Sequence, residues 1–79
     1  MTFKQAYKIA MEKSAKFRAH DARVKEAQAN GGETGCLVFT VSAGESFFYG
    51  FDGVDLHAGK HTRRRAATLG ARDEVLLIL

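Results

Sequence analysis

The segment HAGKHTRRRAATLG, residues 57–70, holds the side chains best suited to bind an anionic partner. The sequence predicts the start of a helix at Thr62. Four cations and one imidazole surround this position, namely Lys60, His61, Arg63, Arg64 and Arg65. Free N–H groups at the start of a helix attract anions, and arginine forks match carboxylate and phosphate oxygens. These five residues are therefore the predicted partner-binding site, either for the acidic side chains of a protein or for the phosphates of a nucleic acid.

A solvated helix face explains the same arginines without any partner. Consecutive helical positions are rotated by about 100°, so Arg63, Arg64 and Arg65 cannot all face one way. One or two of them could instead pair with acids of the chain itself. The candidate acids are Asp52, Asp55, Asp73 and Glu74. Cations in a first helical turn also oppose the helix dipole by up to about 1 kcal/mol, so their position calls for a compensating anion.

Other reactive residues do not combine into a catalytic or metal site. His57 and His61 have the spacing of zinc-binding histidines on a helix, but Gly59 lies between them and Cys36 is the single thiol. Cys36 beside a histidine could act as a nucleophile, although a cysteine in a strand more often packs as a small apolar residue. The tetrapeptide GKHT, residues 59–62, lacks the glycine spacing and the Ser/Thr of a phosphate-binding loop. We therefore expect a protein that is not an enzyme and has no metal and no cofactor.

Charge is distributed unevenly along the chain, whose net charge is +3. Residues 1–32 carry seven Lys or Arg and three acids, residues 33–59 carry four acids and no Lys or Arg, and residues 60–79 carry five Lys or Arg and two acids. The cations of the first segment suit a solvated helix surface, and they could also follow a phosphate backbone. Nucleic-acid binding is therefore the alternative to protein binding.

The first third of the chain is predicted to form one long helix. Thr2 and Gln5 have the spacing of a capping box, helix-forming residues continue to Ala29, and the sequence NGG at residues 30–32 provides a stop. Residues seven positions apart give the helix an apolar face: Phe3, Ala10, Phe17 and Val24. This face must pack against the rest of the chain.

The composition then changes to β-branched and aromatic residues, which predict a hairpin of residues 35–42 and 46–51. Alternation divides the first strand into two faces, one with Leu37, Phe39 and Val41 and the other with Cys36, Val38 and Thr40. Asp52 and Gly53 predict a tight turn into a short third strand over 54–57, with Val54 and Leu56 facing inward. Most of the rings between residues 47 and 51 are expected in the core rather than stacked on bases.

The last part of the chain predicts a helix and a strand. Thr62 begins a short helix over residues 62–69, which stops at Gly70. Residues 74–79, Glu74 followed by an apolar run, suit a strand inside the sheet, covered on both faces. The predicted fold class is therefore α+β: a long N-terminal helix packed on a small, mostly antiparallel sheet, in the order helix-strand-strand-(strand)-helix-strand.

The chain is predicted to form one domain, residues 1–79, because so short a chain cannot be divided into two cores. Its single cysteine excludes an internal disulfide and favours a reducing cytoplasm. No run approaches about 18 apolar residues and the N-terminal lysines do not suit a signal peptide, so we expect no membrane partner.

Adjacent apolar residues such as Phe47 and Phe48 point to opposite faces of the sheet. Apolar area left over on either face would contact a second copy, as a homodimer, or another protein.

With its helix, the aromatic hairpin GCLVFTVSAGESFFYGF and the basic segment GKHTRRRAATLGARD, the chain resembles the small standalone anti-CRISPR proteins of phages and mobile elements. The resemblance is one of size, layout and texture over the whole chain. It implies a non-catalytic inhibitor that acts in the cytoplasm of a bacterial host. Such an inhibitor binds a subunit or the surveillance complex of a type I CRISPR system and blocks target DNA binding. The basic charge differs from that of the acidic members that mimic DNA, so the basic segments would bind an acidic protein surface or the guide RNA.

Overall fold

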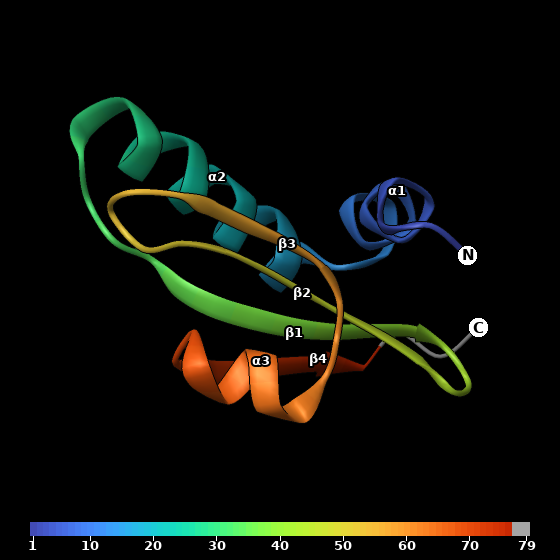
Figure 1. Cartoon of the computed structure of the whole chain (residues 1–79). Helices are drawn as coiled ribbons and strands as arrows, with labels where there is room; N and C mark the ends of the chain where they lie inside the picture. The colour runs from blue at the N-terminus through green and yellow to red at the C-terminus, as the bar shows by residue number, and fades with distance from the viewer. Residues whose placement is uncertain (77–79) are drawn as a thin grey trace.

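The computed structural model describes the backbone of residues 1–76 and the side chains of residues 1–71. Its elements are α1 (Phe3–Lys13), α2 (Ala15–Asn30), β1 (Gly35–Ser42), β2 (Glu45–Phe51), β3 (Leu56–Lys60), α3 (Arg63–Thr68) and β4 (Ala71–Leu76). The sheet order is β3-β2-β1-β4, with β1 antiparallel to β2, β2 antiparallel to β3 and β1 parallel to β4. Helices α1 and α2 lie on one side of the sheet and α3 lies on the other (Figure 1). The fold is α+β, as the sequence predicts.

The N-terminal helix is divided at Ser14, which corrects the prediction of one long helix. Ser14 has an extended backbone, its N–H donates to the carbonyl of Ala10 at 2.9 Å, and its hydroxyl accepts from the N–H of Phe17 at 3.0 Å. One residue therefore ends α1 and begins α2, because a serine side chain competes with the helix for backbone N–H groups. The predicted capping box at the start of α1 is confirmed, since the Thr2 hydroxyl accepts from the N–H of Gln5 and the Gln5 side chain accepts from the N–H of Thr2.

The core has two parts, one on each face of the sheet. The larger part lies between the sheet and the helices α1 and α2, and its buried members are Ala6, Ala10, Phe17, Val24, Ala27, Leu37, Phe39, Val41, Phe47, Tyr49 and Phe51. The smaller part lies on the α3 side and contains Cys36, Val38, Phe48 and Ala66. The predicted alternation along the first strand is confirmed, and the aromatic residues of β2 are core residues.

The third strand begins two residues later than predicted. The Asp52 carboxylate accepts from the N–H groups of Val54 at 2.9 Å and Asp55 at 2.7 Å, so residues 52–55 form the turn rather than the start of a strand. The prediction that Val54 and Leu56 face inward is wrong: Val54 is 81% exposed and Leu56 is 47% exposed. Exposed apolar side chains consequently lie at the start of β3.

The last strand also differs from its prediction in place and in extent. It covers residues 71–76 rather than 74–79, since α3 ends at Thr68 and the turn at Gly70 leads directly into the strand. Among the described strands it pairs only with β1 and lies at the edge of the sheet, so the prediction of a strand inside the sheet is wrong. The predicted strand residues 77–79 lie outside the described part of the chain.

Candidate functional site

The structure places the predicted cations at the end of β3 and at the start of α3. Lys60 is the last residue of β3, and α3 begins at Arg63. Thr62 is the predicted N-cap and its hydroxyl accepts from the N–H of Arg65 at 3.1 Å, which fixes the first turn of α3. The side chains of all four cations are exposed: Lys60, Arg63, Arg64 and Arg65. These four residues are called the basic cluster below.

His61 is set apart from the basic cluster although it lies within it in the sequence. Its backbone N–H donates to the carbonyl of Ser46 at 2.7 Å, which continues the β2–β3 pairing by one residue. The residue is half-buried, in contrast to the exposed cations on either side. His61 therefore positions the chain between β3 and α3, and it offers a partner less surface than the sequence predicts.

The basic cluster has no internal counter-charge in the part of the chain whose side chains are described. No ion pair among residues 1–71 joins any of its four cations to an acid. The suggested pairing with Asp52 or Asp55 is not seen, because these acids lie in the turn at the opposite end of β3. The other two candidate acids, Asp73 and Glu74, lie outside the described side chains.

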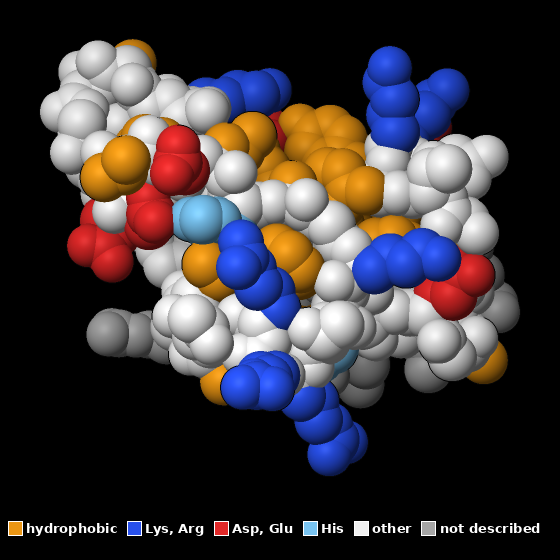
Figure 2. Space-filling view, in the orientation of Figure 1, with side chains coloured by type: hydrophobic (Ala, Val, Ile, Leu, Met, Phe, Trp, Pro, Cys, Tyr) orange, Lys and Arg blue, Asp and Glu red, His pale blue; other side chains and the backbone are white. Residues whose placement is uncertain are grey.

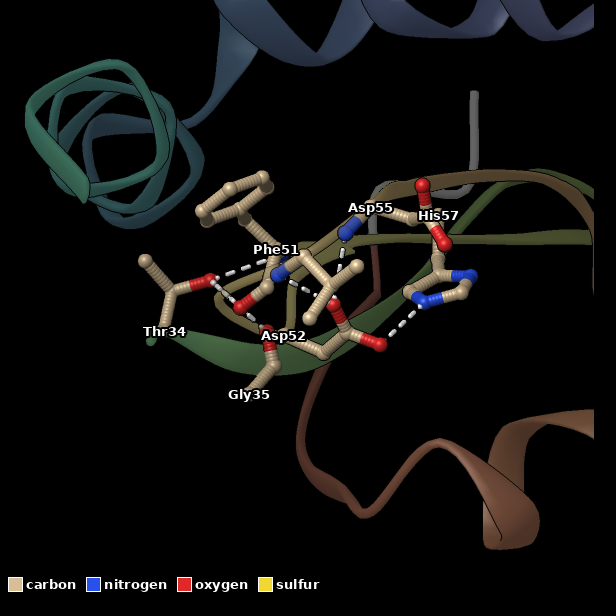
Figure 3. Close-up of polar contacts among 7 residues, drawn as sticks. Thr34, Gly35, Phe51, Asp52, Asp55 and His57 are labelled. Carbon is tan, nitrogen blue, oxygen red and sulfur yellow. Dashed lines mark hydrogen bonds and ion pairs between the residues drawn. The ribbon is translucent and has the colours of Figure 1, made fainter. Parts of the chain in front are cut away.

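The turn between β2 and β3 forms an acidic counterpart to the basic cluster (Figure 3). Asp52 binds the two turn N–H groups with one carboxylate oxygen, and its other oxygen lies 2.7 Å from Nε2 of His57. The backbone N–H of Asp55 and the imidazole of His57 hold the pKa of Asp52 well below its usual range. Asp52 therefore stays ionised, and with Asp55 it makes this end of β3 negative.

The two ends of β3 thus carry opposite charge on one side of the molecule. Figure 2 shows acidic side chains gathered beside a histidine over the β2–β3 turn, and Lys and Arg side chains over the middle of the view and over α3. The chain order acidic turn, strand, basic cluster explains this polarity, because a strand of five residues holds its two ends apart. The uneven charge of the sequence therefore places acidic residues at the start of β3 and basic residues at its end.

Cys36 and His57 lie in one row of the sheet but do not form a catalytic pair. Gly50 of β2 is the register partner of both residues, so no side chain stands between them. The thiol is only 4% exposed, however, and burial raises the pKa of Cys36. A nucleophilic cysteine needs a lowered pKa and access for its substrate, so Cys36 behaves as a small core residue. No group of three His, Cys, Asp or Glu among the described residues is placed to hold a metal ion.

A buried polar cluster between the helices and β2 was not predicted from the sequence. Asp21 of α2 is 3% exposed and accepts hydrogen bonds from the hydroxyls of Tyr7 at 2.6 Å and Tyr49 at 2.8 Å. The ammonium group of Lys25 lies 3.1 Å from its second oxygen. Burial alone would raise the pKa of Asp21, but the hydrogen bonds from Tyr7, Tyr49 and Lys25 outweigh it and hold the pKa below its ordinary value. The signal was an acid on the apolar face, between Phe17 and Val24.

Burial and the charge of Asp21 raise the pKa values of both tyrosines, so both hydroxyls remain protonated donors. His20 adds a second tie from α2, because its Nε2 lies 2.9 Å from the backbone carbonyl of Tyr49. The cluster joins α1, α2 and β2 and leaves Asp21 closed to solvent. It therefore anchors the helices on the sheet and does not form a ligand site.

No protein-family model, curated protein or solved structure matches this chain. Among the residues that the structure describes, no helix has the length and apolar character needed to cross a bilayer. The functional assignment consequently depends on the geometry and charge of the surface itself.

Proposed function

We propose that this protein is a non-catalytic binding protein whose basic cluster contacts an acidic surface of another protein. The observation that carries this proposal is the exposure of Lys60, Arg63, Arg64 and Arg65 without an ion pair to any described acid. Cations held close together repel one another, and an acidic partner relieves that repulsion. The Thr62 cap and the end of β3 fix the backbone below them, so little backbone freedom is lost on binding.

The resemblance to small anti-CRISPR proteins supplies a specific candidate for the partner. In this finer form of the proposal, the protein acts in the bacterial cytoplasm and binds a subunit or the surveillance complex of a type I CRISPR system, and thereby blocks target DNA binding. Support comes from the small α+β fold and from the exposed basic cluster. In such a stoichiometric contact, complementary charge contributes mainly specificity and association rate.

Reversing the charge at Arg64 is expected to weaken partner binding by about tenfold, because a cation at the rim of a contact contributes to association rate and to charge complementarity. The measurement is a tagged pull-down from a host lysate that carries the CRISPR system, followed by binding kinetics on the captured protein. Lys13→Glu is the matched control, since it makes the same change in net charge on the exposed end of α1. We expect Lys13→Glu to bind within about twofold of the unmodified protein.

Nuclease treatment separates a protein partner from a nucleic acid in the same experiment. Capture that survives nuclease and depends on Arg64 supports the proposal. Capture that disappears after nuclease contradicts the proposal. If Lys13→Glu is then as damaging as Arg64→Glu and the affinity falls steeply as salt rises, the result indicates nucleic-acid binding along the helix lysines.

A further inference from the structure

Strand β3 has an unpaired edge. It pairs with β2 on one side and is the last strand in the sheet order, so no described strand lies on its other side. It has five residues and the chain contains no proline. Edge strands present free N–H and C=O groups that can pair with another chain unless proline, charge or a covering segment prevents it. Only Lys60 among the residues of β3 provides such a charge.

The backbone groups on this free edge belong to alternate residues. The N–H of His61 donates to β2, and Gly59 and His57 follow with the same orientation because the antiparallel pattern alternates. Leu56, Ala58 and Lys60 therefore direct their N–H and C=O groups away from β2. All three side chains are exposed on the sheet face that α1 and α2 cover elsewhere.

Two of the three large apolar side chains that are exposed among the described residues lie at the same place. Val54 is 81% exposed and Leu56 is 47% exposed, and Met1 is the other large apolar residue that is exposed among those described. The sequence predicts apolar area left over on the faces of the sheet, and among the described residues Leu56 provides it, on the face of α1 and α2 at the β3 edge. Burial of such side chains on an edge strand favours association.

Charge complementarity selects the occupant of this edge. Asp52 and Asp55 lie at the start of β3, and Lys60 and Arg63 lie at its end. A second copy that approaches antiparallel places its basic end beside the acidic end of the first copy, and the same contact occurs twice by symmetry. A parallel approach would place acid beside acid and base beside base, which is repulsive. The charges therefore favour a two-fold contact between identical strands.

We propose that the protein forms a homodimer by antiparallel pairing of β3 with β3 of a second copy. The register that uses all three outward residues centres on Ala58, so that Ala58 faces Ala58 of the second copy and Leu56 faces Lys60. The alkyl stem of Lys60 then covers Leu56, and Asp55 lies opposite His61 of the second copy, about one residue from Lys60 and about two from Arg63. The two sheets join into one continuous sheet across the two-fold axis. Lys60 and Arg63 belong both to the basic cluster and to this contact, whereas Arg64 lies outside β3. Variants of Arg64 therefore test the partner contact separately from dimerisation.

Analytical ultracentrifugation of the full chain tests the dimer, and we expect a species of twice the 8.7 kDa chain mass whose dissociation constant rises with salt. Ala58→Pro removes an outward N–H and leaves the bonds to β2 intact, a change that edge strands tolerate. We expect this variant to be monomeric, with an unchanged circular dichroism spectrum. A monomer at every concentration of the unmodified chain, or a dimer that persists in a folded Ala58→Pro variant, overturns the proposal.

A charge exchange provides a second test, in which the double variant keeps the net charge of the unmodified chain. Asp55→Lys and Lys60→Asp are each expected to weaken the dimer by about tenfold. The double variant restores complementary ends and should recover most of the lost dimer affinity. A double-mutant cycle measures this recovery as a coupling between the two sites. Additive losses in the double variant contradict the antiparallel arrangement. Arg64→Glu serves as the control that impairs partner capture and leaves the dimer within about twofold of the unmodified chain.

Discussion

Replacement of Gly50 by alanine is expected to destabilise the protein by about 3 kcal/mol, the upper part of the usual range for overpacked sites. Gly50 is buried in β2 opposite Cys36, and a Cβ atom at this position would collide with the carbonyl oxygen of Gly35 and lie 2.8 Å from Cα of Cys36. Both obstacles are backbone atoms, so no side-chain rotation can relieve the contact. The strands β1 and β2 would have to separate at the centre of the sheet.

Gly59→Ala is the matched control for this substitution. Gly59 lies in the neighbouring strand β3, and a Cβ there would approach the ring of Phe48 at 3.5 Å, an ordinary van der Waals contact. We expect a change of less than about 0.5 kcal/mol in the free energy of unfolding. Urea titration followed by circular dichroism compares the two variants at equal net charge. Equal stabilities would show that the sheet can open at Gly50 without cost.

Replacement of Asp21 by alanine is also expected to cost about 3 kcal/mol, because it removes the common acceptor of two hydroxyls and the partner of Lys25. The hydroxyl of Tyr49 would then be buried without an acceptor. Glu26→Ala removes a carboxylate from the exposed side of the same helix and is expected to change stability by less than about 0.5 kcal/mol. A similar loss in both variants would contradict the role of Asp21 as an anchor.

The Asp21 carboxylate also gives stability a dependence on pH with a definite sign. Its pKa in the folded protein is below the ordinary value of 3.8, so its contribution is present above pH 3.8 and is lost as the pH falls through the folded pKa. Asp21→Asn lacks this proton equilibrium and should lose less stability than the unmodified chain on acidification. Chemical unfolding at a series of acidic pH values measures the difference. The pKa of Asp52 is also lowered, but Asp52 is present in both proteins and contributes equally to the pH dependence of their stability. The difference between their free energies of unfolding at each pH therefore reports on Asp21.

Local signals in the sequence predicted most of the fold. Thr2 and Thr62 cap their helices, the alternation in β1 separates the two cores, and Asp52 with Gly53 forms a turn. Each of these features is decided within a few residues. The break at Ser14 was missed because its neighbours are strong helix formers, although its hydroxyl can cap a new helix at Phe17.

The candidate site was only partly predictable for the same reason. The exposure of Arg63 and Arg64 follows from charge alone, but the separation of His61 depends on its pairing with Ser46, far away in the sequence. The partners of Asp21 likewise come from α1 and β2, and no spacing rule connects them. The unpaired edge of β3 depends on the order of strands in the sheet, which periodicity does not encode.

The order of the elements along the chain also determines what a chain shortened before α3 would retain. Every buried member of the larger core that the structure describes lies between Ala6 and Phe51, so such a chain keeps all of these residues. Val38 and Phe48 would lack the cover of Ala66, and the outer edge of β1 would lack β4. Exposed apolar surface and open strand edges make incomplete chains prone to aggregation. The last quarter of the sequence therefore covers apolar surface of the hairpin as well as completing the sheet.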